Sequence, residues 1–244
     1  MPYPTLPVVL SAAAVLAACA PMSAQAPGDA GSHAMGFFVT SGNPGRGGDL
    51  GGIEGADRYC QALASGVGAG ARIWRAYLST VATVAGPPVN ARDRIGTGPW
   101  YNAKGVLIAR NVEELHGANH VSKQTALTEK GEVLSGRGDA VNMHDILTGS
   151  LPDGRASAAA SDTTCGNWTH DGAGSALVGH HDRMGLDDSV AAKSWNSSHA
   201  SRGCGMDALK ATGGAGRLYC FAADTPAVPP AVPSGRAMGG ASGY

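Results

Sequence analysis

The sequence is poor in aromatic and charged residues. Aromatic residues make up 5% of the 244-residue chain, with only three phenylalanines, and charged residues make up 15%. The net charge is −1 and the two signs are mixed, so we expect no basic face for nucleic acid and no acidic tail. The 37 glycines predict a loop-rich fold of short elements, whose aromatic-poor core gains stability from cross-links.

Several enzyme motifs are also missing. The glycine-rich stretch 42–52 matches neither GxxxxGK[ST] nor GxGxxG, so we expect no nucleotide ligand. No GxSxG nucleophile elbow occurs, and two disulfides in the body of the chain would leave no cysteine nucleophile there. The sequence therefore favours a protein that is not an enzyme.

Five cysteines divide into one near the start and four in the body of the chain. In an exported chain, an even number in the body predicts two disulfides, for which three pairings are possible. The body cysteines are Cys60, Cys165, Cys204 and Cys220.

The remaining cysteine, Cys19, follows an apolar stretch at 8–18 that is too short to span a bilayer. The ending Leu-Ala-Ala-Cys resembles the lipobox of bacterial lipoproteins, although residues 1–7 contain no lysine or arginine. We expect a signal peptide over 1–19 and acylation of Cys19, which would tether the protein to a membrane outside the cytoplasm. Ordinary cleavage near Ala18 or Ala26 is the alternative and would give a periplasmic or secreted protein.

Composition divides the rest of the chain into a folded segment and two Pro/Gly/Ala-rich stretches. We expect a flexible linker at 20–35, one domain at 36–223 and a disordered tail at 224–244. Within the domain, apolar patterning predicts strands and helices separated by a long loop region at about 120–215. The expected strands are 36–40, 73–79, 105–109 and 217–221, and the expected helices run from Ile53 to Gly66 and from an Asn111 N-cap to Leu115.

Long ordered motifs carry a family resemblance across 36–223. The run GGIEGADRYCQALA, then RAYLS, VNARD, VEELHG, LTGSLPDGR before CGNW, and the closing RLYCF is similar to the endostatin domain of collagen XVIII. GPWYNAKGV, TALTEKGE, HDILTGS, TCGNWT, GHHDR and SWNSSH resemble a family of secreted bacterial lectin-like proteins. The resemblance implies an α+β, C-type lectin-like (endostatin-like) fold, with one or two helices packed on short antiparallel strands.

The same resemblance implies two nested disulfides, Cys60–Cys220 and Cys165–Cys204. It does not carry over a complete calcium site, because Leu151-Pro152-Asp153 and Trp195-Asn196-Ser197 each lack one ligand of the triplets that sugar-binding C-type lectins use. The zinc site of endostatin needs a His-rich N-terminus, where this chain has only His33. We therefore expect no cofactor on the basis of family motifs.

Histidines and aspartates cluster between 144 and 199, with three His-Asp dipeptides at 144–145, 170–171 and 181–182. His180, Asp182 and His199 imitate a two-histidine, one-carboxylate metal site and are the metal candidates. Hydrogen bonding within irregular loops is the competing interpretation, and the sequence favours it.

Tryptophan and asparagine side chains in the same region are candidates for a sugar platform. Trp168 is expected in the core, whereas Trp195 is equally compatible with the core and with a binding face. With the two candidate histidines included, the predicted ligand-binding residues are Asn142, Asp153, Asn167, His180, Trp195, Asn196 and His199.

Three functions remain open at this stage. The leading hypothesis is a lectin-like, non-enzymatic binding protein outside the cytoplasm that recognises a glycan or another cell-surface polymer. The second is a structural or protein-interaction envelope lipoprotein. The third is a metal-dependent enzyme that uses the His/Asp cluster.

Overall fold

The protein is described by a computed structural model covering residues 1, 33–84, 86–158 and 161–224. The predicted signal peptide after Met1, the lipobox with Cys19, the linker up to residue 32 and the tail from 225 lie outside the described residues. Near the two ends of the described segment, Gly36 N donates to Tyr101 O and Asp224 pairs with Arg72.

One strand, β8 (Gly214–Ala222), organises the main sheet. It pairs antiparallel with β1 (Phe37–Val39) on one side. On the other side, its C-terminal part pairs antiparallel with β2 (Trp74–Ala76) and its N-terminal part pairs parallel with β5 (Asp145–Leu147). The sheet continues antiparallel through β6 (Leu177–His180) to β7 (His199–Ala200).

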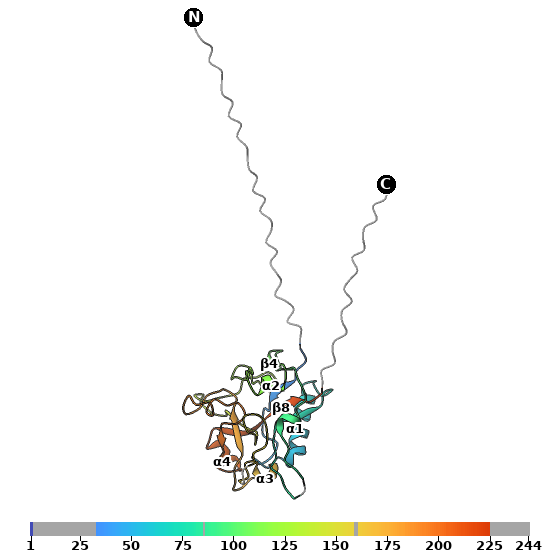
Figure 1. Cartoon of the computed structure of the whole chain (residues 1–244), viewed down its shortest axis with the longest axis vertical. Helices are drawn as coiled ribbons and strands as arrows, with labels where there is room; N and C mark the ends of the chain where they lie inside the picture. The colour runs from blue at the N-terminus through green and yellow to red at the C-terminus, as the bar shows by residue number, and fades with distance from the viewer. Residues whose placement is uncertain (2–32, 85, 159–160, 225–244) are drawn as a thin grey trace, which may run out of the picture. The chain divides into compact units, whose positions relative to one another are not determined.

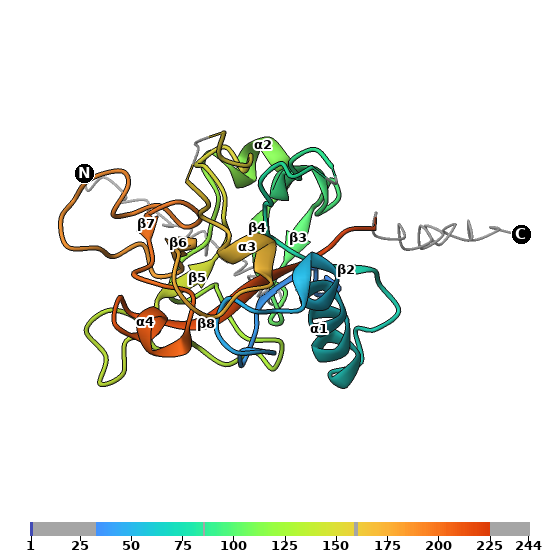
Figure 2. The ribbon, with the colours of Figure 1, turned by 90° about the horizontal axis from the view of Figure 1, so that it is seen from below.

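The remaining elements are short and lie around this sheet. A two-stranded sheet pairs β3 (Trp100–Tyr101) with β4 (Leu107–Ala109). Figure 2 shows β8 running across the domain, with α1 and β2 towards one end and α4 with β5–β7 towards the other. The helices are α1 (Gly52–Gly66), η1 (Ala91–Asp93, a 3-10 turn), α2 (Val112–Leu115), α3 (Cys165–Trp168) and α4 (Met206–Lys210).

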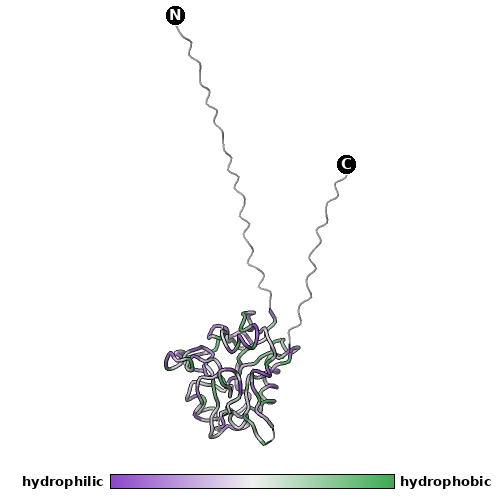
Figure 3. Tube along the Cα trace, viewed as in Figure 1, coloured by the Kyte–Doolittle hydropathy of each residue, from purple (hydrophilic) through white to green (hydrophobic). Residues whose placement is uncertain are grey.

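The alternation of side chains along the strands divides the core into two clusters. Leu218 and Cys220 of β8 point to one face of the sheet, where they pack with α1. Tyr219 and Phe221 point to the other face, where they pack with Trp100 and other aromatic side chains. Short green and purple stretches therefore alternate along the folded chain in Figure 3.

Helix α1 is the longest helix of the described residues (Figure 1). It packs on β2, which lies next to it in Figure 2. Its buried positions Ala56, Cys60 and Ala64 recur every four residues, which places them on one face. Cys60 on this face forms a disulfide with Cys220 of β8, with the Cα atoms 5.6 Å apart. Among the described residues, no helix is long and apolar enough to cross a membrane.

The second disulfide, Cys165–Cys204, fastens the loop region between β5 and β8. It joins α3, whose residues Gly166 and Asn167 are left-handed, to the segment just before α4. Asn167 Oδ1 accepts from Val81 N while its Nδ2 donates to Val81 O, so this turn is held against a neighbouring loop.

The mixed α+β class, the short elements and both disulfide pairings are confirmed. Asn111 caps α2 as predicted, with its Oδ1 accepting from Glu114 N. The stretch 120–215 is mostly loop, but it also supplies β5, β6 and β7. Apolar patterning did not reveal these strands, because Asp145, Gly179 and the histidines interrupt their short apolar runs.

Candidate metal centre

The register of three neighbouring strands brings polar side chains onto one face of the sheet. Asp145 of β5 lies directly opposite His180 of β6. His199 of β7 lies opposite Val178, two residues from His180, so the two histidines share a face. Asp145, His180 and His199 are therefore gathered by strand pairing alone.

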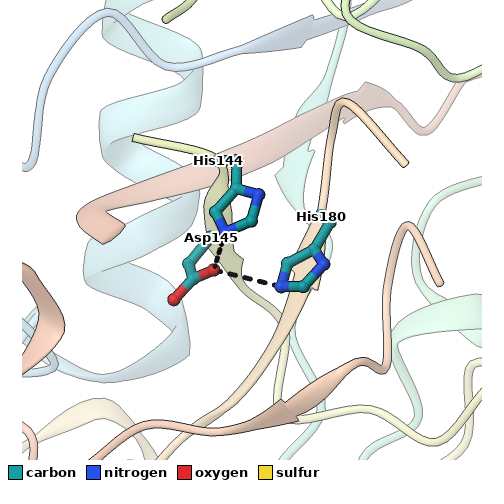
Figure 4. Close-up of side chains that lie close together, drawn as sticks. All are labelled: His144, Asp145 and His180. Carbon is teal, nitrogen blue, oxygen red and sulfur yellow. Dashed lines mark ion pairs between the residues drawn. The ribbon is translucent and has the colours of Figure 1, made fainter. Parts of the chain in front are cut away.

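Three imidazole rings converge on one oxygen of Asp145. Its Oδ1 lies 3.2 Å from His144 Nε2, 3.3 Å from His180 Nε2 and 3.6 Å from His199 Nε2. Figure 4 shows the carboxylate beside the edges of the first two rings, with one oxygen facing a nitrogen of each. These two rings stack with their centroids 4.0 Å apart. The side chains of His144, Asp145 and His180 are at most 3% exposed, whereas that of His199 is 37% exposed.

The other nitrogen of each ring already has an oxygen neighbour. His144 Nδ1 lies 3.2 Å from Asp182 Oδ1, His180 Nδ1 lies 2.7 Å from Ala192 O, and His199 Nδ1 lies 3.2 Å from Ala200 O. These oxygens accept hydrogen bonds, so each Nδ1 donates. In the neutral rings, each Nε2 therefore presents a lone pair towards Asp145.

The carboxylate at the centre is charged. Burial by itself raises the pKa of Asp145, but the His180, His199 and His144 rings, when they carry a proton on Nε2, outweigh it, and the pKa lies below its usual value. A metal ion on the Nε2 atoms would supply the positive charge in place of those protons. Asp145 in turn raises the pKa of His199 against the lowering effect of burial, which means that this position favours a positive charge.

Hydrogen-bond acceptors gather around Asp145 without donors to pair with them in the described part of the chain. Both oxygens of Asp145 and the Nε2 of His180 are buried and have no hydrogen-bond partner among the described residues. Unpaired buried polar groups are costly, and a buried carboxylate is more so. A cation bonded to the Nε2 lone pairs and to Asp145 would satisfy all of these atoms together.

The distances suit a transition-metal ion. Ligands about 2.0–2.1 Å from a tetrahedral zinc ion are about 3.3–3.4 Å from one another. The three Nε2–Oδ1 distances of 3.2, 3.3 and 3.6 Å are close to that edge. The ligand atoms of His144, Asp145 and His180 also all lie within 4.8 Å of one another. His199 is not part of that group, so its partly exposed ring would have to move closer to complete the set. The stacked rings of His144 and His180 would have to tilt so that both lone pairs point at one ion. Imidazole ligands with a single carboxylate favour zinc, copper, iron or nickel over calcium.

Asp182 has a supporting position. Its Oδ1 accepts from His144 Nδ1 and from Met184 N, and its Oδ2 accepts from Arg137 N. Burial by itself raises the pKa of Asp182, but these hydrogen bonds outweigh it and hold the pKa well below its usual value. Carboxylates behind a metal-binding histidine commonly fix its tautomer and orientation in this way.

Gly179 lets the segment 192–196, which supports His180, pack closely against β6. A Cβ at this position would lie 1.9 Å from the carbonyl oxygen of Trp195, so any larger residue would push the 192–196 loop away. That loop carries the Ala192 carbonyl that accepts from His180.

A pocket of about 690 Å³ opens over the centre. His144, His180 and His199 line it, whereas Asp145 is not among its lining residues. An ion held by the three rings and Asp145 would therefore face the pocket on the histidine side.

The predicted metal candidates are only partly brought together. His180 and His199 both belong to the centre, but Asp182 lies on the far side of His144 and contacts its Nδ1. Asp145 and His144 are the members that the candidate set left out. The sequence held a signal for both, the first of its three His-Asp dipeptides, but only strand pairing shows that this dipeptide meets His180.

The predicted sugar-binding residues are dispersed. Trp195 is buried in the aromatic core cluster, and Asn196 is buried with its Nδ2 donating to Tyr77 Oη. Asn167 holds the α3 turn, and Asp153 forms an exposed pair with Arg155. Asn142 lines the pocket beside the centre. Trp168 is in the core, as expected.

Fold and site together define a disulfide-bonded α+β domain with a buried His₃Asp cluster at the base of an open pocket. Comparison of this chain with protein-family models and with curated proteins finds no match.

Proposed function

We propose that this protein binds a transition-metal ion, most simply zinc, through His144, Asp145, His180 and His199. The observation that carries the proposal is the convergence of three Nε2 atoms on Asp145 Oδ1, with each Nδ1 already donating to another oxygen. The role of the ion is to anchor a ligand in the adjoining pocket without chemical conversion.

The test is a zinc titration of chelator-treated protein by calorimetry, with metal content measured after dialysis. We expect one zinc per chain, and loss of binding in the double variant His144→Gln/His180→Gln. His170→Gln is the matched control, because His170 is exposed and outside the cluster. Failure of the wild-type protein to bind any of zinc, copper, nickel or iron would overturn the proposal.

The scaffold of this site is proposed to be a C-type lectin-like domain related to endostatin and to secreted bacterial lectin-like proteins. The α+β class, the short strands and the nested pairing Cys60–Cys220 and Cys165–Cys204 support this assignment. In this setting the bound ligand would be a glycan or another cell-envelope polymer. A glycan array probed with zinc-loaded protein and with chelator-treated protein tests this part, and equal failure of both would count against it.

The protein is further proposed to act outside the cytoplasm, tethered through an acylated Cys19. Two disulfides support an oxidising compartment, and the Leu16-Ala17-Ala18-Cys19 sequence supports acylation. Radiolabelled palmitate should enter the wild-type protein expressed in a bacterium with lipoprotein processing. The Cys19→Ala variant should remain unlabelled.

A metal-dependent enzyme is the second candidate, and one observation favours it. The centre borders an open pocket and His199 is partly exposed, whereas a purely structural zinc site is closed to ligands. Ester and phosphoester hydrolysis that requires zinc and is lost in His199→Gln would favour this candidate over binding alone.

A further inference from the structure

We propose that the pocket over the His₃Asp centre binds an oxyanion, a carboxylate or phosphate group, through Arg137 and Arg202 together with the metal ion. This inference rests on the proposed metal binding and adds the chemical class of the ligand. It is carried by the side chains that line the pocket.

Two arginines of this pocket lack side-chain partners among the described residues. Nine of the twelve arginines in this part of the chain donate from their side chains to a carboxylate, a carbonyl or another acceptor. Over the same residues, the exceptions are Arg58, Arg137 and Arg202, whose guanidinium groups have neither a hydrogen bond nor an ion pair. Two of these three line the pocket beside the histidines.

The charge of the pocket wall is positive in a chain of net charge −1. Arg137, Arg202 and Lys210 line it, against Asp187 as the lining carboxylate. Lys210 likewise has no ion pair within the described part of the chain. The single charge of Asp145 is less than that of a divalent ion, so a bound metal would make the site more positive still.

The location of these cations fits a ligand that bridges them to the metal. The histidine side of the centre faces the pocket, which leaves a bound ion accessible from there. Guanidinium groups match the planar geometry of carboxylate and phosphate oxygens. One oxygen of such a group could bind the metal ion while another accepts hydrogen bonds from an arginine side chain.

The experiment uses cobalt(II)-loaded protein, whose visible absorption reports changes at the metal. Glucuronate, glucose 6-phosphate and glucose are titrated at constant ionic strength. We expect both anions to change the cobalt spectrum and to bind at least about tenfold more tightly than glucose, because each charged contact near the surface contributes about a fivefold factor. The ratio between glucuronate and glucose 6-phosphate shows which oxyanion is preferred.

Variants assign the effect to the pocket. Arg137→Gln and Arg202→Gln should each weaken glucuronate or glucose 6-phosphate binding by about fivefold. Arg58 is the third unpaired arginine of the described residues and lies exposed on α1. Arg58→Gln should therefore leave binding unchanged. Failure of the protein to bind cobalt or any of zinc, copper, nickel and iron overturns the proposed function and this inference with it. Cobalt uptake without preference for the anions, or equal losses in Arg58→Gln and Arg202→Gln, overturns this inference alone.

Discussion

Asp145 Oδ1 lies 3.3 Å from His180 Nε2 across the paired strands β5 and β6, yet neither atom has a hydrogen-bond partner within the described residues. A carboxylate and an imidazole at this separation would ordinarily form a hydrogen bond. Here the His180 proton is on Nδ1, where Ala192 O accepts it at 2.7 Å. The proposed metal ion, bound to both atoms from one side, would account for this contact, and that account can be tested.

Asp145→Asn should abolish the stabilisation of the protein by zinc. An ion at 100 times its Kd stabilises the folded state by about 2.7 kcal/mol, which corresponds to a rise in Tm of about 5–10 °C for a domain of this size. Thermal unfolding with zinc and with chelator should show this rise in the wild type. The variant should unfold at one temperature under both conditions, and a retained rise would exclude Asp145 as a ligand.

Asp182→Asn should weaken zinc binding by about 10- to 100-fold, because it removes the carboxylate that orients His144. Calorimetry measures the change, and the stoichiometry should remain one ion per chain. Asp187→Asn is the control, since Asp187 lines the pocket but contacts none of the three histidines. Loss of stoichiometry in Asp182→Asn would instead make Asp182 a direct ligand.

The two disulfides should differ in their contribution to stability. In the chain-entropy model, Cys60–Cys220 with a separation of 160 residues contributes about 5 kcal/mol and Cys165–Cys204 with a separation of 39 about 4 kcal/mol. The double alanine variants of each pair, compared by urea unfolding, should both be destabilised, and the first more so. The reverse order would show that strain or residual structure outweighs loop length.

Asp57 should be essential for stability although it does not line the pocket. It is buried and pairs with Arg94 at 2.7 Å and with the more exposed Arg75 at 2.8 Å. Asp57→Ala should cost about 3–5 kcal/mol in the free energy of unfolding, because Arg94 is left without its counter-charge. Arg75→Gln should cost less than about 1 kcal/mol, since its charge remains solvated. Equal costs would contradict this account.

Trp195→Ala should act on folding and not specifically on ligand binding. The side chain is 3% exposed and packs with Tyr77, Tyr219 and Phe221. Its removal should cost about 3–5 kcal/mol, measured by urea unfolding, while the conservative Trp195→Phe should cost less and keep zinc affinity. A stable Trp195→Ala variant that lost only sugar binding would restore the sugar-platform hypothesis.

Elements with strong local signals were predictable from the sequence. Helix α1 repeats buried residues every four positions, and Asn111 followed by Glu114 marks the start of α2. The expected resemblance to lectin-like proteins implied both disulfide pairings, which the structure contains. Strands β5, β6 and β7 could not be found in this way, because polar residues and a glycine interrupt their apolar runs and pairing with neighbouring strands holds them in place.

The candidate site was predictable only in part, for the same reason. The sequence predicted His180 and His199 as metal ligands because they are histidines in a polar region. It placed Asp182 with them because Asp182 is close to His180 in the sequence. In the structure, Asp145 replaces Asp182 beside the Nε2 atoms, since β5 pairs with β6 in a register that sets Asp145 opposite His180. Tryptophan chemistry suggested a binding face for Trp195, but packing against β8 placed it in the core.

The sequence by itself determined the α+β class, the loop-rich character and the even set of body cysteines, because composition and local periodicity carry that information. Only the tertiary structure decided which polar groups meet. Strand register joins Asp145, His180 and His199 over a separation of more than 50 residues. Burial leaves the acceptors of Asp145 and His180 facing each other without donors among the described residues. Such an arrangement depends on long-range pairing that no local pattern encodes.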